Sequence, residues 1–107
     1  MCGIAGYFNL KKKLNMNDLR NNSIKMCNVL KRRGPDSQGV WVDQNLNITL
    51  SHRRLSIIDL NKRSDQPMIS KNGRFVIVFN GEIYNFKELR EILQIKGVKF
   101  RTNSDTE

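Results

Sequence analysis

The sequence lacks the features of a membrane or secreted protein. No apolar run approaches the roughly 20 residues that a membrane-spanning helix needs. No basic segment precedes the first apolar stretch, as it would in a secretory signal, because the lysine-rich "LKKKL" follows that stretch. These absences predict one intracellular, cytoplasmic domain without a membrane partner.

Cysteine and histidine are scarce. The two cysteines, Cys2 and Cys27, can form one bridge at most, and we interpret them as two thiols with different roles in a reducing compartment. Cys27 falls on the apolar face of a predicted helix, which indicates a core position. His52 is the only histidine, and the charges of Arg53 and Arg54 beside it would disfavour its protonation. We therefore interpret His52 as a structural or surface residue.

The sequence also lacks the spacing of cofactor sites. One histidine and two distant cysteines do not form a metal-ligand pattern. Neither a P-loop nor a dinucleotide-binding glycine pattern occurs. We expect no metal and no cofactor within these residues.

Positive charge is in excess, with 19 Lys and Arg against 10 Asp and Glu and a net charge of +9. Such an excess is typical of nucleic-acid-binding proteins. The basic residues lie in short clusters that do not interleave with aromatic residues as a stacking surface would. The pattern argues against nucleic acid as a partner, although a non-enzymatic basic binding module remains an alternative.

The apolar periodicity predicts an α+β domain. One helix is expected from Met16 to about Lys31, with Asn15 or Asn17 as its N-cap and Gly34-Pro35 beyond its end. A second helix is expected from Phe86 to about Lys96, closed by Gly97. Strands are predicted at residues 2–8, 39–42, 46–50, 54–60, 74–79 and 98–100. Most neighbouring strands should be antiparallel because their connections are too short for crossovers.

Two Asn-Gly pairs occur in different surroundings. Asn72-Gly73 lies between two strand-like runs, which predicts a type I′ hairpin turn. Asn80-Gly81 is followed by a short segment and then by a helix. It is either a second hairpin turn or a site formed by the Asn amide and the Gly N–H.

Cys2 stands directly behind the initiator methionine in "MCGIAGYF". If Met1 is removed, this residue carries a thiol and a free α-amine, whose pKa near 8 leaves about a tenth of it neutral at pH 7. Such an amine can accept the thiol proton without any histidine. The alternative is an inert, buried cysteine near a chain end.

Six segments in order resemble a known family: "MCGIAGYF", "RGPDSQG", "HRRLSIIDL", "QPM", "FNGEIYNF" and "SDTE". They are similar to the N-terminal glutaminase domain of glutamine-hydrolysing asparagine synthetases, a class II glutamine amidotransferase. The resemblance covers essentially the whole chain. It implies the N-terminal-nucleophile hydrolase fold, an αββα sandwich of antiparallel sheets, of which residues 1–107 are an N-terminal part. The rest of that domain and the synthetase domain are expected to be absent from a fragment of this length.

The resemblance also implies the roles of ten residues. Cys2 matches the nucleophile, and Asn80 and Gly81 match the donors of the oxyanion hole. Arg54 matches the arginine that pairs with the α-carboxylate of glutamine. The remaining matches line the substrate pocket or hold the α-ammonium group: Leu55, Ser56, Ile57, Ile58, Glu82 and Asp105.

The activity that the resemblance implies is hydrolysis of L-glutamine to glutamate and ammonia. The ammonia would serve the ATP-dependent amidation of aspartate to asparagine in the missing synthetase domain, which would use ATP and Mg. That domain is therefore an expected partner, and a homodimer is left open. An alternative is an amidotransferase of the same class that serves another acceptor.

Overall fold

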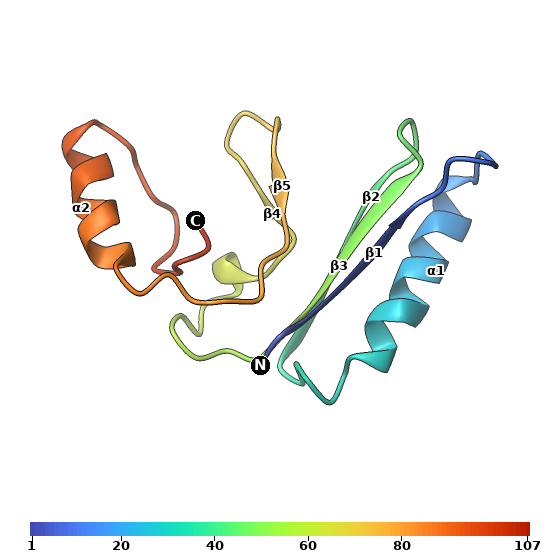
Figure 1. Ribbon diagram of the computed structural model, residues 1–107, viewed down its shortest axis with the longest axis horizontal. Coiled ribbons are helices and arrows are strands. Elements are labelled where there is room, and N and C mark those ends of the chain that lie inside the picture. The colour runs from blue at the N-terminus through green and yellow to red at the C-terminus, as the bar shows by residue number, and fades with distance from the viewer.

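Two groups of elements make up the computed structural model, which describes residues 1–107. Figure 1 shows the groups at opposite ends of an elongated molecule that measures 46 × 31 × 19 Å. The first group contains β1 (Gly3–Phe8), α1 (Met16–Val29), β2 (Ser37–Asp43) and β3 (Ile48–Arg54). The second contains the 3-10 turn η1 (Lys62–Ser64), β4 (Met68–Ile69), β5 (Val76–Ile77) and α2 (Phe86–Ile95). All strand pairs are antiparallel, which confirms the predicted α+β class.

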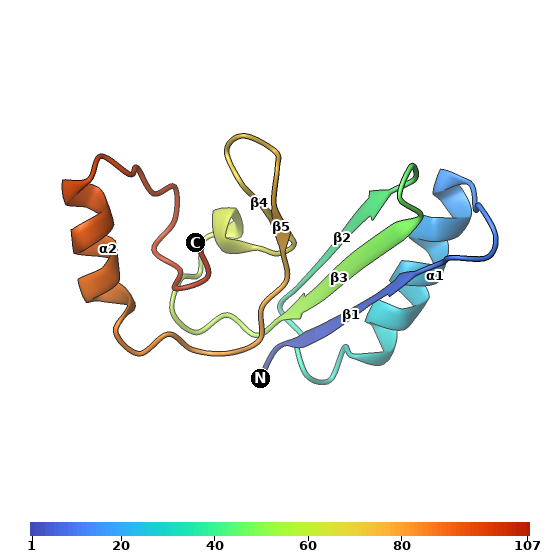
Figure 2. The same ribbon diagram turned by 45° about the horizontal axis from the view of Figure 1, so that its top comes forward.

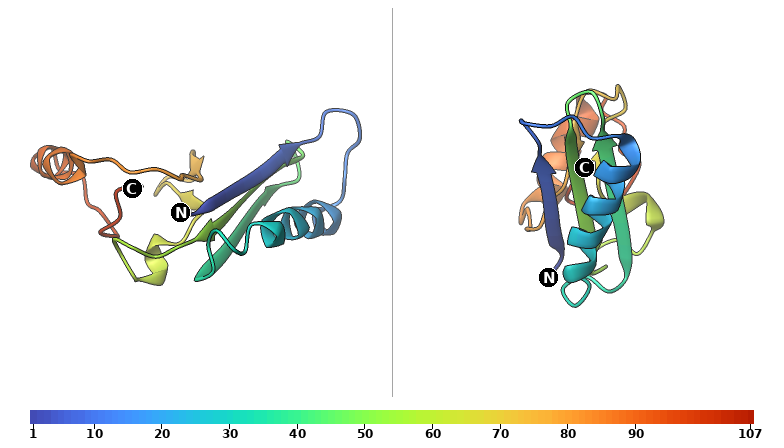
Figure 3. Two further views of the ribbon diagram at one scale, coloured as in Figure 1. Left: turned by 60° about the horizontal axis from the view of Figure 1, so that its bottom comes forward. Right: turned by 90° about the vertical axis from the view of Figure 1, so that its right-hand side faces the viewer.

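Helix α1 covers one face of a three-stranded sheet with the strand order β1-β3-β2 (Figures 2 and 3). The hydroxyl of Tyr7 on β1 donates to the carbonyl of Leu19 on α1 at 3.5 Å. Leu19 and Cys27 are fully buried between helix and sheet. The predicted core position of Cys27 is therefore confirmed.

The opposite face of this sheet has no helix over it (Figure 3). Side chains alternate along β1, and Ile4 and Phe8 point away from α1 with 48% and 57% of their surface exposed. On β3, their antiparallel partners are His52 and Ile48. The first sheet thus has one packed face and one largely uncovered apolar face.

Both helices lie close to their predicted ranges. Asn15 is the N-cap of α1, because its side-chain oxygen accepts the N–H of Asp18 at 2.8 Å. The alternative cap, Asn17, lies inside the helix. The helices end at Val29 and Ile95, one or two residues before the predicted ends. Neither has the length and apolarity that crossing a bilayer requires.

Two predicted strands are wrong. Residues 55–60 form no strand, because side chains and not a neighbouring strand accept backbone N–H groups there: the Ser56 N–H donates to the Asp36 carboxylate, and the Leu55 N–H to Cys2 Sγ. Residues 98–100 form none either, because the N–H of Val98 donates to the carbonyl of Leu93 at the end of α2.

The remaining predicted strands differ in extent. The strand predicted at 39–42 lies inside β2, and the one predicted at 2–8 matches β1. The strand predicted at 46–50 starts later and runs to Arg54 as β3. Only Val76–Ile77 of the predicted 74–79 run forms a strand, and its partner β4 was not predicted.

The Asn72-Gly73 pair lies in the hairpin that joins β4 to β5, as predicted, but the turn is not type I′. A type I′ turn needs positive φ at both central residues. Only Gly73 has it, at 71°, and Asn72 does not. The loop is closed by the N–H of Ser70, which donates to the carbonyl of Phe75 at 2.9 Å.

The segment after η1 crosses β2 at a close approach. A Cβ atom on Gly39 would lie 1.9 Å from the carbonyl oxygen of Gln66, so only glycine fits there. On the same strand, the hydroxyl of Ser37 donates to Asp65 at 2.9 Å. These contacts attach the second group of elements to the first sheet.

Candidate functional site

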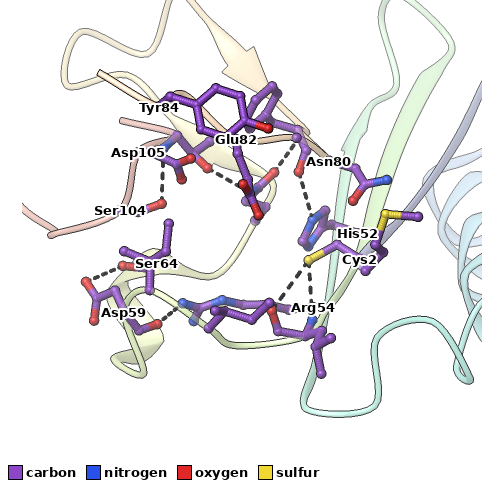
Figure 4. A pocket seen from close by; sticks show the side chains of 18 residues that line it. Cys2, His52, Arg54, Asp59, Ser64, Asn80, Glu82, Tyr84, Ser104 and Asp105 are labelled. Atoms are coloured by element: carbon purple, nitrogen blue, oxygen red, sulfur yellow. Dashed lines mark hydrogen bonds between the residues drawn. The ribbon is translucent and has the colours of Figure 1, made fainter. Parts of the chain in front are cut away.

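An open pocket of about 410 Å³ lies where the two groups of elements meet (Figure 4). Nine of the ten predicted site residues line it: Cys2, Arg54, Leu55, Ile57, Ile58, Asn80, Gly81, Glu82 and Asp105. Ser56 does not, because it turns toward the "RGPD" loop, where its N–H donates to the Asp36 carboxylate at 2.7 Å. The fold therefore gathers residues that are more than a hundred positions apart.

Cys2 lies directly before β1, and both its sulfur and its backbone are held. The N–H of Leu55 points to Cys2 Sγ at 3.3 Å, and the Leu55 carbonyl lies 3.6 Å from the same atom. The side chain of Arg33 donates to the Cys2 carbonyl at 3.1 Å. Cys2 is half-buried and forms no disulfide. Its thiol is thus fixed at the wall of the pocket and still accessible.

The "RGPD" loop supports this wall. A Cβ atom on Gly34 would lie 2.3 Å from the carbonyl carbon of Arg53, so the loop contacts β3 closely. The N–H of Asp36 donates to the carbonyl of Arg54 at 3.0 Å. This supporting role of the loop was not predicted from the sequence.

Arg54, the last residue of β3, is 7% exposed and held by three groups. Its Nη1 forms an ion pair with Asp65 at 2.9 Å and donates to the Asn61 carbonyl at 3.0 Å. Its Nη2 donates to the carbonyl of Asp59. A guanidinium has five N–H donors, so Nε–H and one N–H of Nη2 are left without a protein partner.

Asp59 joins segments that are far apart in the sequence. Its carboxylate accepts the hydroxyl of Ser64 at 2.6 Å and the N–H groups of Asn103 and Asn61 at 2.9 and 2.8 Å. These three hydrogen bonds, that of Ser64 first, lower the pKa of Asp59 to about 2. Asp59 therefore stays ionised and connects the loop after β3 to the C-terminal segment.

Asn80 and Gly81 follow β5 with no strand after them, so the hairpin alternative is wrong. The Asn80 side chain is exposed to the pocket, and neither its amide nor the Gly81 N–H has a protein partner. These are neutral donors that a ligand could use.

Glu82 and Asp105 line the part of the pocket away from Cys2 and His52 (Figure 4). The Asp105 carboxylate accepts the N–H of Ile83 at 3.0 Å, which ties the C-terminal segment to the loop before α2. With Arg54, the pocket therefore presents a cation and carboxylates in one space. This combination is complementary to a zwitterion.

His52 is buried, with 1% of its surface exposed, so a surface role is wrong. Its Nε2 lies 3.2 Å from the carbonyl oxygen of Phe79, which requires the proton on Nε2, and its Nδ1 is buried without a partner. Burial, followed by the charge of Arg54, lowers the pKa of His52, and the hydrogen bond to Phe79 opposes this shift. The direction predicted from the sequence is confirmed, but burial and not arginine is the main cause.

Several residues that line the pocket were not predicted from the sequence, among them Asp59, Ser64 and Gln66. Asp59 lies inside the segment "HRRLSIIDL" and Gln66 inside "QPM", which both contributed to the resemblance. Those motifs were the available signal, although neither gave a role for these side chains. No cluster of three or more His, Cys, Asp or Glu side chains that could hold a metal ion is present.

Comparison with known proteins gives a consistent set of relatives. A family model described as a glutamine amidotransferase domain matches residues 1–107. The chain is 42% identical over 107 residues to asparagine synthetase [glutamine-hydrolyzing] 1 of Bacillus subtilis, covering 100% of this chain and 16% of that protein. It is 36% identical over 107 residues to asparagine synthetase B [glutamine-hydrolyzing] of Escherichia coli, covering 100% of this chain and 18% of that protein. The chain thus spans less than a fifth of the length of these relatives.

Proposed function

Because the chain belongs to the glutamine amidotransferase domain family, we propose that its pocket hydrolyses L-glutamine to glutamate and ammonia. The observation that carries the proposal is the meeting of a thiol, an arginine, two neutral donors and two carboxylates in one pocket: Cys2, Arg54, Asn80, Gly81, Glu82 and Asp105. Each of these groups has a partner on a glutamine molecule.

The two ends of the amino-acid part of glutamine need opposite charges. Arg54 would bind the α-carboxylate through its free N–H groups, because a guanidinium can make two parallel hydrogen bonds to a carboxylate. Glu82 and Asp105 would hold the α-ammonium group. Leu55, Ile57 and Ile58 line the same space and would exclude water from the side chain of the substrate.

The reaction begins once Met1 has been removed. The α-amine of Cys2 accepts the thiol proton, and the sulfur attacks the carboxamide carbon, so that a C–S bond forms and negative charge moves to the oxygen. Asn80 and Gly81 donate to this oxygen, and each such donor is worth about 3–4 kcal/mol in barrier height. The intermediate collapses, the α-ammonium of Cys2 protonates the leaving nitrogen, and the C–N bond breaks to release ammonia. Water then hydrolyses the thioester to glutamate and regenerates the thiol.

The rest of the proposal concerns a longer protein. Residues 1–107 would be the N-terminal part of an αββα sandwich of the N-terminal-nucleophile hydrolase fold, and the uncovered face with Ile4 and Phe8 supports a second sheet over it. The ammonia would be used for ATP-dependent amidation of aspartate by a cytoplasmic synthetase domain, as the names of the relatives suggest. ATP and Mg would act in that domain, and no step described above uses them.

The experiment compares the two cysteines in the full-length protein that carries this sequence. Cys2→Ala should abolish glutamine-dependent asparagine synthesis and leave ammonia-dependent synthesis intact, because only the first uses the thiol. Cys27→Ala, which removes the buried thiol of α1, should keep both activities. Glutamine-dependent synthesis by Cys2→Ala would refute the proposal, and so would an intact mass that retains Met1 on the active protein.

A further inference from the structure

Two buried side chains form hydrogen bonds to the backbone of Phe79, the residue directly before the Asn80-Gly81 pair. Gln66 Oε1 accepts the Phe79 N–H at 2.5 Å, and His52 Nε2 lies 3.2 Å from the Phe79 carbonyl oxygen. We propose that Gln66 and His52 are positioning residues, which fix the direction in which Asn80 and Gly81 present their donors to the substrate oxygen. The inference rests on the proposed glutaminase function and assigns these two residues a role within it.

The geometry of the peptide bond explains how these two hydrogen bonds fix the backbone of Phe79. The Phe79 N–H belongs to the peptide plane before that residue, and its carbonyl belongs to the plane shared with Asn80. Holding one group in each plane leaves neither φ nor ψ of Phe79 free to rotate. The Cα atom of Asn80 is therefore placed by Gln66 and His52 together.

The positions of Gln66 and His52 are themselves fixed. His52 is 1% exposed on β3, the central strand of the sheet. Gln66 is 8% exposed, its backbone lies against Gly39 of β2, and its Nε2 donates to the hydroxyl of Thr106 at 3.2 Å. The Phe79 N–H can only donate, so it requires the amide orientation that places Oε1 toward it and Nε2 toward Thr106. Through Gln66 and His52, the backbone before Asn80 and Gly81 is thus attached to the same sheet whose first strand follows Cys2.

Residues 80–82 form no hydrogen bond, and the next backbone group held after Phe79 is the Ile83 N–H, which donates to Asp105 at 3.0 Å. The Asn80 side chain is exposed and has no hydrogen-bond partner in the protein, and no strand follows to fix Gly81. Loss of one oxyanion donor costs about 10²- to 10³-fold in kcat, and a misplacement of about 1 Å can cost about 10²-fold. A small rotation at Phe79 would consequently affect the chemical step more than substrate binding.

The test uses Gln66→Met and His52→Leu in the full-length protein, with glutaminase activity as the readout. Both replacements introduce an apolar side chain of similar size and remove the hydrogen bond to Phe79. We expect kcat to fall about 10- to 100-fold while the KM for glutamine changes less than about threefold. The matched control is Gln94→Met, the same replacement on the exposed surface of α2, and should change neither constant.

A second readout reports on the oxyanion donors directly. The aldehyde analogue of glutamine, glutamate γ-semialdehyde, should inhibit by adding the Cys2 thiol across its C=O bond; a C–S bond forms and the thiol proton ends on the oxygen. That oxygen occupies the position of the oxyanion, whereas the product glutamate binds without such an adduct. We expect both variants to weaken inhibition by the aldehyde by about the same factor as kcat and to leave inhibition by glutamate unchanged.

Three outcomes would overturn the inference. One is a kcat within threefold of the parent value in either folded variant. Another is equal weakening of aldehyde and glutamate inhibition, which would indicate a role in substrate binding alone. The third is loss of cooperative unfolding in both variants, which would show that Gln66 and His52 are needed for folding and not for positioning. If only Gln66→Met fails to unfold cooperatively, the kinetics of His52→Leu test the inference. Absence of glutaminase activity in the parent protein would instead refute the proposed function, so the two failures are distinguishable.

Discussion

The guanidinium of Arg54 and the carboxylate of Asp65 form a 2.9 Å ion pair beside the pocket, with 9% and 30% of their side chains exposed. Asp65 also accepts the hydroxyl of Ser37 on β2. The arginine proposed to bind the substrate carboxylate is therefore oriented by an anion that is itself attached to the sheet. A guanidinium in such a setting points in one direction before any substrate arrives.

Replacing Asp65 with asparagine should weaken glutamine binding. The charge-assisted hydrogen bond to Arg54 becomes a neutral one, and such bonds differ by about 1 kcal/mol or more. We expect the KM for glutamine to rise about 5- to 20-fold with kcat within about threefold, measured by glutamate release. Glu91→Gln, at an exposed position of α2, is the matched control and should leave both constants unchanged. An unchanged KM in Asp65→Asn would mean that Arg54 needs no support from this carboxylate.

Gly39→Ala should destabilise the protein and disrupt the pocket. A Cβ atom at this position would overlap the Gln66 carbonyl, and overpacking of this kind costs about 1–3 kcal/mol. Chemical denaturation should report that loss together with reduced glutaminase activity. Gly73→Ala is the control: it strains a residue with φ of 71° but has no atom within 4 Å of the added group. It should lose about 1 kcal/mol and keep the activity.

The stability of the fold should depend on pH through His52. Burial lowers its pKa from the ordinary value of 6.5, so the unfolded chain binds the proton more readily than the folded one. The contribution of neutral His52 is complete above pH 6.5 and is lost as pH falls toward the lowered folded pKa. The free energy of unfolding should therefore decrease as the pH falls below 6.5. His52→Leu should flatten this dependence, and an equal slope in both proteins would contradict the assignment.

Phe8→Ala should reveal what lies over the open face of the first sheet in the full-length protein. If a second sheet packs there, as the proposed sandwich requires, removing the ring should cost about 3–5 kcal/mol in the free energy of unfolding. Leu10→Ala is the control, because Leu10 lies beyond β1 and is 81% exposed. A loss below about 0.5 kcal/mol for Phe8→Ala would show that this face stays in water.

Elements with a clear local signal were predicted well from the sequence. Helix α1 has an Asn15 cap and a repeating apolar face, and β1 alternates between packed and open positions. The strand predicted at residues 54–60 was wrong beyond Arg54. Its apolar content is typical of a strand, but side chains bind its backbone N–H groups. The N–H of Ser56 is bound by Asp36, 20 positions away, and that of Leu55 by Cys2, 53 positions away. Local periodicity does not contain this information.

The candidate site was predictable only through the family resemblance. Position alone favoured an inert Cys2, and spacing alone favoured a turn at Asn80-Gly81. The roles of the supporting residues were not predicted, because they depend on hydrogen bonds between residues distant in sequence: Gln66 with Phe79, and Asp59 with Asn103. The first pair joins the segments on either side of the β4–β5 hairpin, and the second joins the loop after β3 to the C-terminal segment.

The pocket walls come from both ends of the sequence, with Cys2 on one side and Thr106 on the other. At synthesis rates of about 5–20 residues per second, Thr106 leaves the ribosomal catalytic centre about 5–20 s after Cys2. During that interval the nascent chain carries the Cys2 thiol without the opposite wall of the pocket. The proposed glutamine hydrolysis therefore cannot begin until translation has passed Thr106.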